Sequence, residues 1–135
     1  LRIYLAGFFD TRQRLLPIRD LIQSMGHSVV STWLVEVDTH IPGSATPLSS
    51  ASSIIAATRD LREVSQVDLF LVDTHDVTPR GGREVELGWA LARGIFTVIV
   101  GPRRNVFHHI TNLPFDSWED ALEGLQKGLT GCAPN

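Results

Sequence analysis

The stretch at residues 80–88, RGGREVELG, combines two glycines with two glutamates in a spacing that could support ligand chemistry. Gly81 and Gly82 precede a helical pattern, so the backbone can approach a ligand closely and the helix start offers unpaired N–H groups. Glu86 would lie in the first helical turn or just after it, with its carboxylate directed back toward the preceding strand. The alternative is that Glu84 and Glu86 only complement the helix dipole.

The elements that must position this stretch alternate between short apolar runs and helical patterns. Strands are expected at residues 3–6, 27–33, 67–73, 97–100 and 113–115. Helices are expected at 12–25, 49–66 and 84–93, and Ser117 should cap a last one with Asp120. Residues 37–50 are expected to form a loop. This alternation predicts an α/β fold, a flavodoxin-like or Rossmann-like three-layer sandwich with a five-stranded parallel sheet.

Ligands of such sheets bind at the carboxyl ends of the strands. Three predicted loops leave those ends, at residues 7–10, 73–86 and 101–109. No GxGxxG follows the first strand, which argues against a dinucleotide enzyme. The five histidines lack metal-ligand spacing, so we expect neither a catalytic metal nor a cofactor.

Composition limits the class of protein. The 135 residues fit one domain, and 43% hydrophobic with 20% charged residues is a globular profile. A net charge of −3 argues against a sequence-independent nucleic-acid binder. The single cysteine, Cys132, cannot form an internal disulfide, and no signal-peptide pattern or membrane-length apolar run occurs. We therefore expect a cytoplasmic protein without membrane contact.

Four pieces of the sequence share their order and spacing with a known enzyme family. They are YLAGFF at 4–9 (followed by Asp10, Arg12 and Gln13), RDL at 59–61, VDLFLV at 67–72 and GREVELG at 82–88. Together they make the chain resemble the nucleoside 2-deoxyribosyltransferase family and its relatives, the 5'-monophosphate N-glycosidases. The resemblance implies a single domain of this kind over residues 1–135.

The resemblance implies that Glu86 is the nucleophile of an enzyme that cleaves an N-glycosidic bond. A carboxylate can stabilise or attack the charged anomeric carbon, and a retaining route passes through a covalent glycosyl-enzyme. Asp60 is implied to assist at the leaving base or the reacting centre, and Tyr4 to orient the nucleophile by a hydrogen bond. The alternatives are a helix-surface Asp60 beside Arg59 and Arg62, and an ordinary core tyrosine.

Several further residues are candidates for substrate binding. Phe8, Phe9 and Trp33 could form a wall for a flat base, although they are equally typical of a hydrophobic core. Gly7 would allow close approach of the sugar, and Gly82 belongs to the glycine-led signature.

Position 80 departs from both branches of the family. The transferases carry a base-binding aspartate there and the hydrolases a phosphate-binding serine, whereas this chain has Arg80. Asp73 or Asp76 could replace the aspartate, although neither matches in register. The hydrolases also have a phosphate-binding arginine after the first glycine turn, and here that position is Asp10.

Arginines gather in the predicted strand-end loops, at positions 80, 83, 103 and 104. Arginine suits bidentate phosphate binding, so a 5'-phosphorylated substrate stays a candidate because of Arg80, Arg83 and the two arginines at 103–104. The alternative is that these side chains are solvated or pair with Glu84 and Asp76.

The segment 101–109 also resembles the family, where it supplies residues to the site of a neighbouring subunit. Asn105 and His108 are the nearest candidates here. The resemblance therefore implies a homodimer or higher homo-oligomer with shared active sites.

Three functions remain in competition. The first is transfer of a deoxyribosyl group from a nucleoside to another nucleobase. The second is hydrolysis of nucleoside 5'-monophosphates with the same carboxylate. The third is a nucleotide-sensing module without catalysis, against which the presence of both Glu86 and Asp60 argues.

Overall fold

The computed structural model describes residues 1–36 and 50–129, and it contains a five-stranded, all-parallel sheet in the order β2-β1-β3-β4-β5. The strands are β1 (Arg2–Ala6), β2 (Ser28–Val29), β3 (Leu69–Asp73), β4 (Phe96–Val100) and β5 (Leu113–Phe115). The helices are α1 (Arg12–Ser24), α2 (Ser50–Val64), α3 (Gly82–Ala92) and α4 (Trp118–Gln126). Short 3-10 helices are η1 (Phe9–Thr11), η2 (Thr32–Val35) and η3 (Val106–Ile110).

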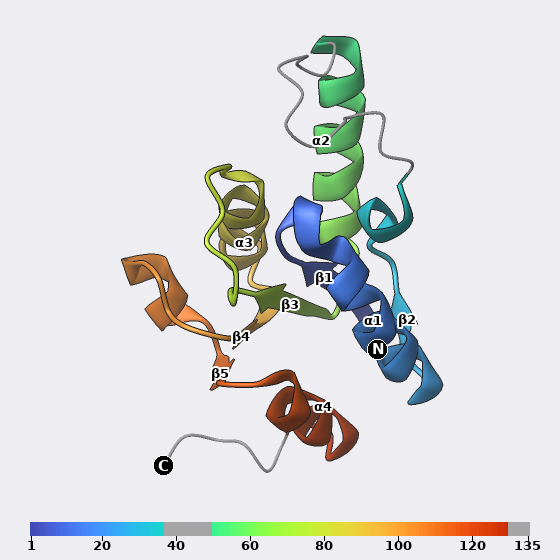
Figure 1. Ribbon diagram of the computed structural model, residues 1–135, viewed down its shortest axis with the longest axis vertical. Coiled ribbons are helices and arrows are strands. Elements are labelled where there is room, and N and C mark those ends of the chain that lie inside the picture. Colours follow the sequence, from blue (N-terminus) through green and yellow to red (C-terminus); the bar gives the residue numbers. More distant parts are fainter. Residues whose placement is uncertain (37–49, 130–135) are drawn as a thin grey trace.

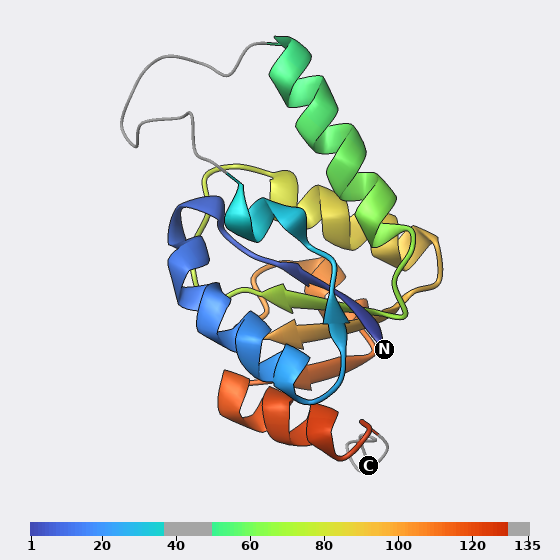
Figure 2. The ribbon, with the colours of Figure 1, turned by 90° about the vertical axis from the view of Figure 1, so that its right-hand side faces the viewer.

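The helices form two layers around the sheet (Figure 1). α1 and α4 cover one face, and α2 and α3 cover the other, as the second view also shows (Figure 2). The predicted α/β three-layer sandwich with a five-stranded parallel sheet is thus confirmed. Because every strand is parallel, the carboxyl ends of β1, β3 and β4 share one edge.

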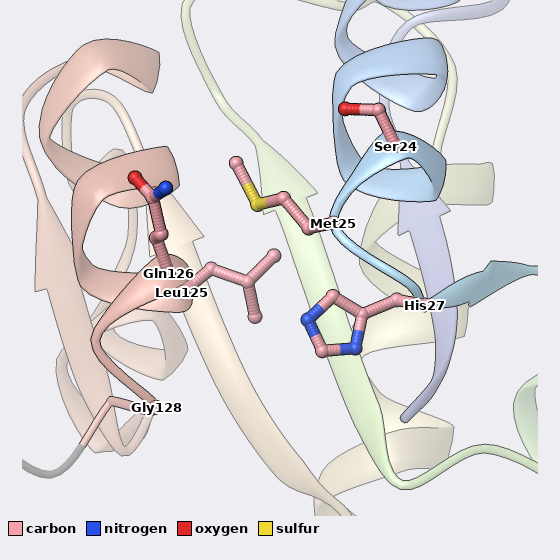
Figure 3. Close-up of a pocket in the computed structure, with 6 residues that line it drawn as sticks. All are labelled: Ser24, Met25, His27, Leu125, Gln126 and Gly128. Atoms are coloured by element: carbon pink, nitrogen blue, oxygen red, sulfur yellow. The ribbon is translucent and has the colours of Figure 1, made fainter.

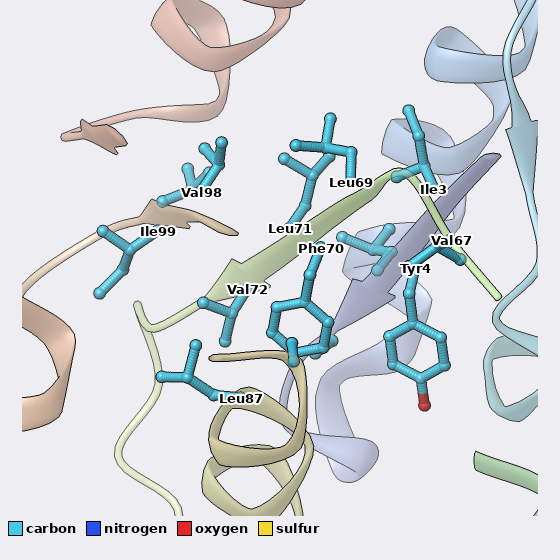
Figure 4. Packing of buried hydrophobic residues seen from close by; sticks show 14 of the residues in the cluster. Ile3, Tyr4, Val67, Leu69, Phe70, Leu71, Val72, Leu87, Val98 and Ile99 are labelled. Carbon is cyan, nitrogen blue, oxygen red and sulfur yellow. The ribbon is translucent and has the colours of Figure 1, made fainter. Parts of the chain in front are cut away.

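Hydrophobic side chains alternate between the two faces of the central strands, as the pleat requires. On the α2 and α3 side, Tyr4 stacks on Phe70 with ring centroids 5.7 Å apart and planes within 3° (Figure 4). Tyr4 on β1 and Phe70 on β3 are register partners in the sheet, and this pairing brings the two rings together. The phenol hydroxyl points away from the sheet, toward the helical layer (Figure 4).

Most predicted boundaries agree with the structure, and helix ends follow the expected chemistry. Gly26 adopts a left-handed φ of 92° after α1, as expected for a residue that ends a helix. Ser117 accepts a hydrogen bond from the Asp120 backbone N–H at 3.1 Å and so caps α4.

The second strand is shorter than predicted. A strand was expected over residues 27–33, but β2 has two residues and η2 then turns the chain. The tertiary contacts explain the difference, because buried Trp33 donates from Nε1 to the Leu5 carbonyl at 2.8 Å instead of continuing an edge ladder. The predicted loop at 37–50 lies outside the described residues apart from Ser50, which begins α2, and Cys132 lies outside them entirely.

No helix within the two described ranges is long and apolar enough to span a bilayer.

Candidate active site

Glu86 lies in the second turn of α3, on the side of the helix that packs toward the sheet. Part of the residue reaches the surface, but its Oε2 atom is buried. Burial raises the pKa of Glu86 to about 8, and the negative charge of Asp60 adds to the rise. The structure therefore places a carboxyl group with an unusually high pKa in the layer between α3 and β1.

Tyr4 belongs to β1 and is completely buried. Its hydroxyl is close enough to Glu86 to lower the pKa of that carboxyl, against the larger effect of burial. In the other direction, burial and then the charge of Glu86 raise the pKa of the phenol well above its usual range. The Tyr4 hydroxyl and Glu86 Oε2 both lack a partner with full hydrogen-bond geometry. The pKa of each group nevertheless responds to the other as to a hydrogen-bond partner, so the two groups are close to forming that bond.

These two oxygens are the buried side-chain polar atoms that residues 1–36 and 50–129 leave without a hydrogen-bond partner. An unsatisfied buried polar group costs about 1–3 kcal/mol, and proteins rarely retain one without a reason. The two atoms, the Tyr4 hydroxyl and Glu86 Oε2, lie close enough to affect each other's pKa, and both belong to residues that the sequence made candidates. The arrangement fits a site that a ligand completes.

Asp60 lies on α2 and is partly buried beside the same site. Its negative charge contributes to the raised pKa of both Glu86 and Tyr4. Burial raises the pKa of Asp60 itself, and a hydrogen bond from Arg59 offsets part of this effect. The structure thus brings together Tyr4, Asp60 and Glu86 from three different elements.

Asp73, at the end of β3, has a different environment. It is 1% exposed, and its carboxylate accepts from both terminal nitrogens of Arg14, at 2.9 and 3.2 Å. It also accepts from Trp118 Nε1 at 2.5 Å and from the His75 backbone N–H at 2.9 Å. These internal donors occupy both oxygens, so the contacts of Asp73 fasten loops together and leave it no evident capacity to bind a base.

Two of the strand-end arginines are also engaged internally. Arg83 is buried and donates from Nη1 to the carbonyls of Asp73 and Asp76, at 3.2 and 2.9 Å. Arg104 donates to the carbonyls of Thr74 and His75, at 2.7 and 2.8 Å. These contacts shape the loop after β3 and direct neither guanidinium toward a ligand. The side chains of Arg80 and Arg103 are exposed.

Asn105 and His108 hold the loop after β4 against α3. Asn105 caps η3, and His108 is completely buried with Nε2 2.9 Å from Glu84 Oε2. Since His108 Nδ1 accepts from the Arg104 backbone N–H at 3.0 Å, Nε2 carries the proton and donates to Glu84. The prediction that Asn105 and His108 reach a neighbouring subunit gains no support from these inward contacts. Glu84, for which the sequence suggested a helix-dipole role or pairing with an arginine, anchors this loop and also pairs with Arg83 at 3.3 Å.

The aromatic candidates lie around the turn after β1. Trp33 is a core residue, and the half-buried Phe9 ring lies 6.2 Å from it at a tilt of 35°. A Cβ atom at Gly7 would come within 2.6 Å of Leu15 Cδ1, so the Leu15 side chain would have to shift to accept a larger residue there. Phe8 is half-buried and Gly82 is exposed at the start of α3, which leaves both accessible.

Sequence reasoning missed the residues that surround Asp60. Arg59 binds Glu36 with two bonds of 3.1 Å, and Glu63 accepts from the Thr32 backbone N–H at 3.0 Å. Arg59 entered the sequence argument as part of the RDL piece and as a neighbour of Asp60, with no role in the site. No local pattern could identify Glu36 as its partner, because 22 residues separate them in the chain.

A hollow of about 510 Å³ lies at the opposite edge of the sheet, between the ends of α1 and α4 (Figure 3). Its lining residues are Ser24, Met25, His27, Leu125, Gln126 and Gly128. It contains no carboxylate, and it is on the other face of the sheet from Glu86. We therefore assign no part of the proposed chemistry to it.

No group of three or more His, Cys, Asp or Glu side chains in the described part of the chain is arranged to hold a metal ion.

The comparisons with known proteins identify similar folds. No protein-family model and no curated protein matches the sequence. A 2-deoxyribosyltransferase from Bacillus psychrosaccharolyticus superposes with a TM-score of 0.72 at 19% identity, with 90% of each chain covered. The CMP N-glycosidase BcmB from Clostridium botulinum does so with 0.60 at 18% identity, covering 93% of this chain and 98% of that one.

A conserved protein from Enterococcus faecalis V583 is a third similar structure, with a TM-score of 0.63, 17% identity and coverage of 94% and 98%. The fold implied by the sequence resemblance is thus the fold that these structures share. At such identities the similarity establishes architecture, and the reaction must be argued from the site.

Proposed function

We propose that this protein cleaves the N-glycosidic bond of a nucleoside with Glu86 as nucleophile and transfers the deoxyribosyl group to another nucleobase. One observation carries the proposal: a buried Glu86 oxygen and the buried Tyr4 hydroxyl both lack partners at the site where Asp60 also lies. The fold similarity to a 2-deoxyribosyltransferase and a CMP N-glycosidase supports it.

The reaction begins with the ionised Glu86 carboxylate attacking the anomeric carbon of the bound sugar. A bond forms between a Glu86 oxygen and that carbon, while the bond from carbon to base nitrogen breaks and its electron pair leaves with the base. The departing base takes up a proton, for which Asp60 is the proposed carrier. In the second half, the nitrogen of an incoming base attacks the same carbon, the bond from that carbon to the Glu86 oxygen breaks and releases the carboxylate, and the incoming base passes its nitrogen-bound proton to Asp60.

Tyr4 has a proposed role in this cycle that follows from its free hydroxyl. An ionised Glu86 in a buried site needs a hydrogen-bond donor, and the phenol supplies one without a compensating loss elsewhere. A small movement on substrate binding would bring the Tyr4–Glu86 contact to full hydrogen-bond geometry. Tyr4 would then hold the carboxylate in line with the anomeric carbon.

Hydrolysis of nucleoside 5'-monophosphates is the second candidate. It uses the same first step, after which water in place of a base attacks the glycosyl-enzyme. The exposed side chain of Arg103, in the loop after β4, favours it because arginine binds phosphate well. The fold shared with a CMP N-glycosidase supports it as well.

Product analysis separates the candidates. The protein is incubated with deoxynucleosides or their 5'-monophosphates, with and without a free acceptor base, and the products are separated by chromatography. Base exchange that requires the acceptor supports transfer, and free base from monophosphates alone supports hydrolysis. Binding without turnover supports a nucleotide-sensing module instead.

The Glu86→Ala variant is the matched test of the nucleophile. It should fold and bind substrate but give no product in either assay. Near-normal turnover by Glu86→Ala would disprove the central claim. Glu119→Ala, which removes an exposed glutamate from α4, serves as the control and should keep full activity.

A further inference from the structure

Arg59 connects the end of η2 with the carboxylate cluster beside Glu86. Its Nη1 and Nη2 atoms bind the two oxygens of Glu36, each at 3.1 Å. Its Nε and Nη2 atoms also bind a single oxygen of Asp60, Oδ1, at 3.1 and 2.9 Å. A longer contact of 3.5 Å joins Arg59 to Glu63.

We propose that Arg59 is a positioning residue of this site: anchored by Glu36, it fixes Asp60 beside Glu86 and supplies the positive charge of the carboxylate cluster. The inference rests on the proposed function, in which Asp60 and Glu86 act on the same substrate. It adds Arg59 and Glu36 to the residues that the reaction requires, although neither touches the reacting atoms.

The geometry of Asp60 supports this assignment. Adjacent residues on a helix do not face one another, so Arg59 reaches Asp60 only because its guanidinium is drawn to one side. Glu36 provides that pull from a separate element, with a two-bond contact that fixes the plane of the guanidinium. No described residue bonds to Asp60 Oδ2, so the aspartate is held by one oxygen and keeps the other for a ligand.

The charges around the site make Arg59 necessary. Glu36, Asp60 and Glu63 lie within its reach, Glu86 faces them from α3, and Tyr4 faces them from β1. Among residues 1–36 and 50–129, Arg59 is the only cation that pairs with any of these acids. Burial is the largest effect on the pKa of both Asp60 and Glu86, and it raises both values. Arg59 lowers them, at Asp60 through a hydrogen bond and its charge and at Glu86 through its charge alone.

The direct test is an NMR titration of the carboxyl carbons of Asp60 and Glu86, which needs no turnover. In Arg59→Met, loss of the positive charge should raise the apparent pKa of Asp60 by about one unit or more, and that of Glu86 by less. Arg62→Met removes the same charge from an exposed position on the same helix and should change neither value. Equal titration curves for the two variants would overturn the proposal.

Kinetics test the positioning role separately from the charge. Glu36→Gln retains Arg59 but weakens its anchor, and Glu36 is not among the groups that shift the pKa of Glu86. The acid limb of its kcat–pH profile, which reports ionisation of Glu86, should therefore stay in place, while kcat falls about tenfold with little change in KM. In Arg59→Met, kcat falls as well, but the acid limb moves to higher pH because the charge that lowers the pKa of Glu86 is lost. This difference between the two variants supports the proposal, and an unchanged kcat in Glu36→Gln overturns it.

Arg59→Lys keeps the charge but cannot bind Glu36 and Asp60 together with one planar group. The acid limb of its kcat–pH profile should stay within a few tenths of a pH unit of wild type, and its kcat should be reduced. A full wild-type kcat would overturn the proposal. Failure of the proposed function is distinguishable, because an inactive wild-type protein would still show the Asp60 shift by NMR. An active protein with unshifted titrations would reject only the role of Arg59.

Discussion

Two buried acids near the carboxyl end of β3 have opposite environments. Asp73, which ends the strand, accepts hydrogen bonds from Arg14, Trp118 and His75. Glu86, in the helix that follows, has a buried oxygen without a partner. The pKa of Asp73 is below its usual value, because these donors outweigh the effect of burial, whereas burial raises the pKa of Glu86 to about 8.

The comparison separates a structural acid from a candidate catalytic one. Burying a carboxylate costs free energy, which internal donors offset at Asp73 and which remains largely uncompensated at Glu86. A fold keeps such a cost when the group must be available to something that the chain does not itself contain. Four experiments break or sharpen this contrast.

The largest effect is expected from Glu86→Gln on activity. The amide keeps the shape of the side chain but cannot form the glycosyl-enzyme, so kcat should fall about a thousandfold or more, equivalent to about 4 kcal/mol in the barrier. Steady-state assays with the better substrate of the product analysis measure it. Asp73→Asn should lose far less kcat at a temperature where it is folded, and an equal loss would erase the distinction between the two acids.

The next largest effect is the cost of Asp73→Asn to stability. In the variant, the amide NH2 replaces one carboxylate oxygen and faces the hydrogen-bond donors of Arg14, Trp118 and His75, which then lack an acceptor. The free energy of unfolding should therefore fall by about 3 kcal/mol. Urea denaturation measures the change. Asp116→Asn, at an exposed aspartate, is the control and should stay within about 0.5 kcal/mol of wild type. A similarly small effect of Asp73→Asn would show that its bonds contribute little.

A third experiment uses pH. The pKa of Glu86 is raised from 4.5 to about 8 in the folded protein, so its contribution to stability is fully present below 4.5 and is lost as pH rises through 8. Relative to wild type, Glu86→Gln should therefore gain about 2 kcal/mol of unfolding free energy between pH 5 and 9. Parallel pH profiles for the two proteins would contradict the raised pKa.

Asp73 should show the reverse dependence. Its pKa is lowered from 3.8, so its stabilisation is present above that value and is lost as pH falls through the lowered one. The difference in stability between wild type and Asp73→Asn should therefore shrink only in acid, below about pH 4.

The smallest effect is expected from Tyr4→Phe on stability. Because the hydroxyl has no partner and the ring keeps its stacking on Phe70, the free energy of unfolding should change by less than about 1 kcal/mol. The same variant should lose about tenfold in kcat if the hydroxyl orients Glu86. A loss of stability above about 2 kcal/mol would show that the hydroxyl already has a partner in solution.

The sequence was sufficient to predict the architecture because its signals are local. Apolar runs bounded by glycine, helical periodicity and the Ser117 cap each depend on a few neighbouring residues. Within residues 1–36 and 50–129, the four α-helices and every strand except the second have bounds close to the predicted ones. The second strand was overestimated because β-branched residues at 29–30 suit an edge strand equally well at any length. Only the contact of Trp33 with Leu5 decides where the chain turns away.

Motif spacing also made Tyr4, Asp60 and Glu86 candidates, and the structure places these three residues near one another. That Glu86 is the nucleophile, and that a nucleoside or nucleotide is the substrate, remain proposals. Sequence could not assign the arginines, since whether a guanidinium meets a phosphate or a carbonyl depends on distant backbone. Arg83 and Arg104 contact carbonyls, which no count of arginines in a loop reveals.

By itself, then, the sequence determined the order of strands and helices and supplied the candidate residues at the predicted site. The tertiary structure alone decided how each charge is compensated. Arg14 and Trp118 compensate Asp73, and Arg59 compensates Asp60. The buried oxygen of Glu86 receives no hydrogen bond from a described residue. The physical reason is that compensation depends on distance and burial. Both are set by elements that meet only in the folded chain.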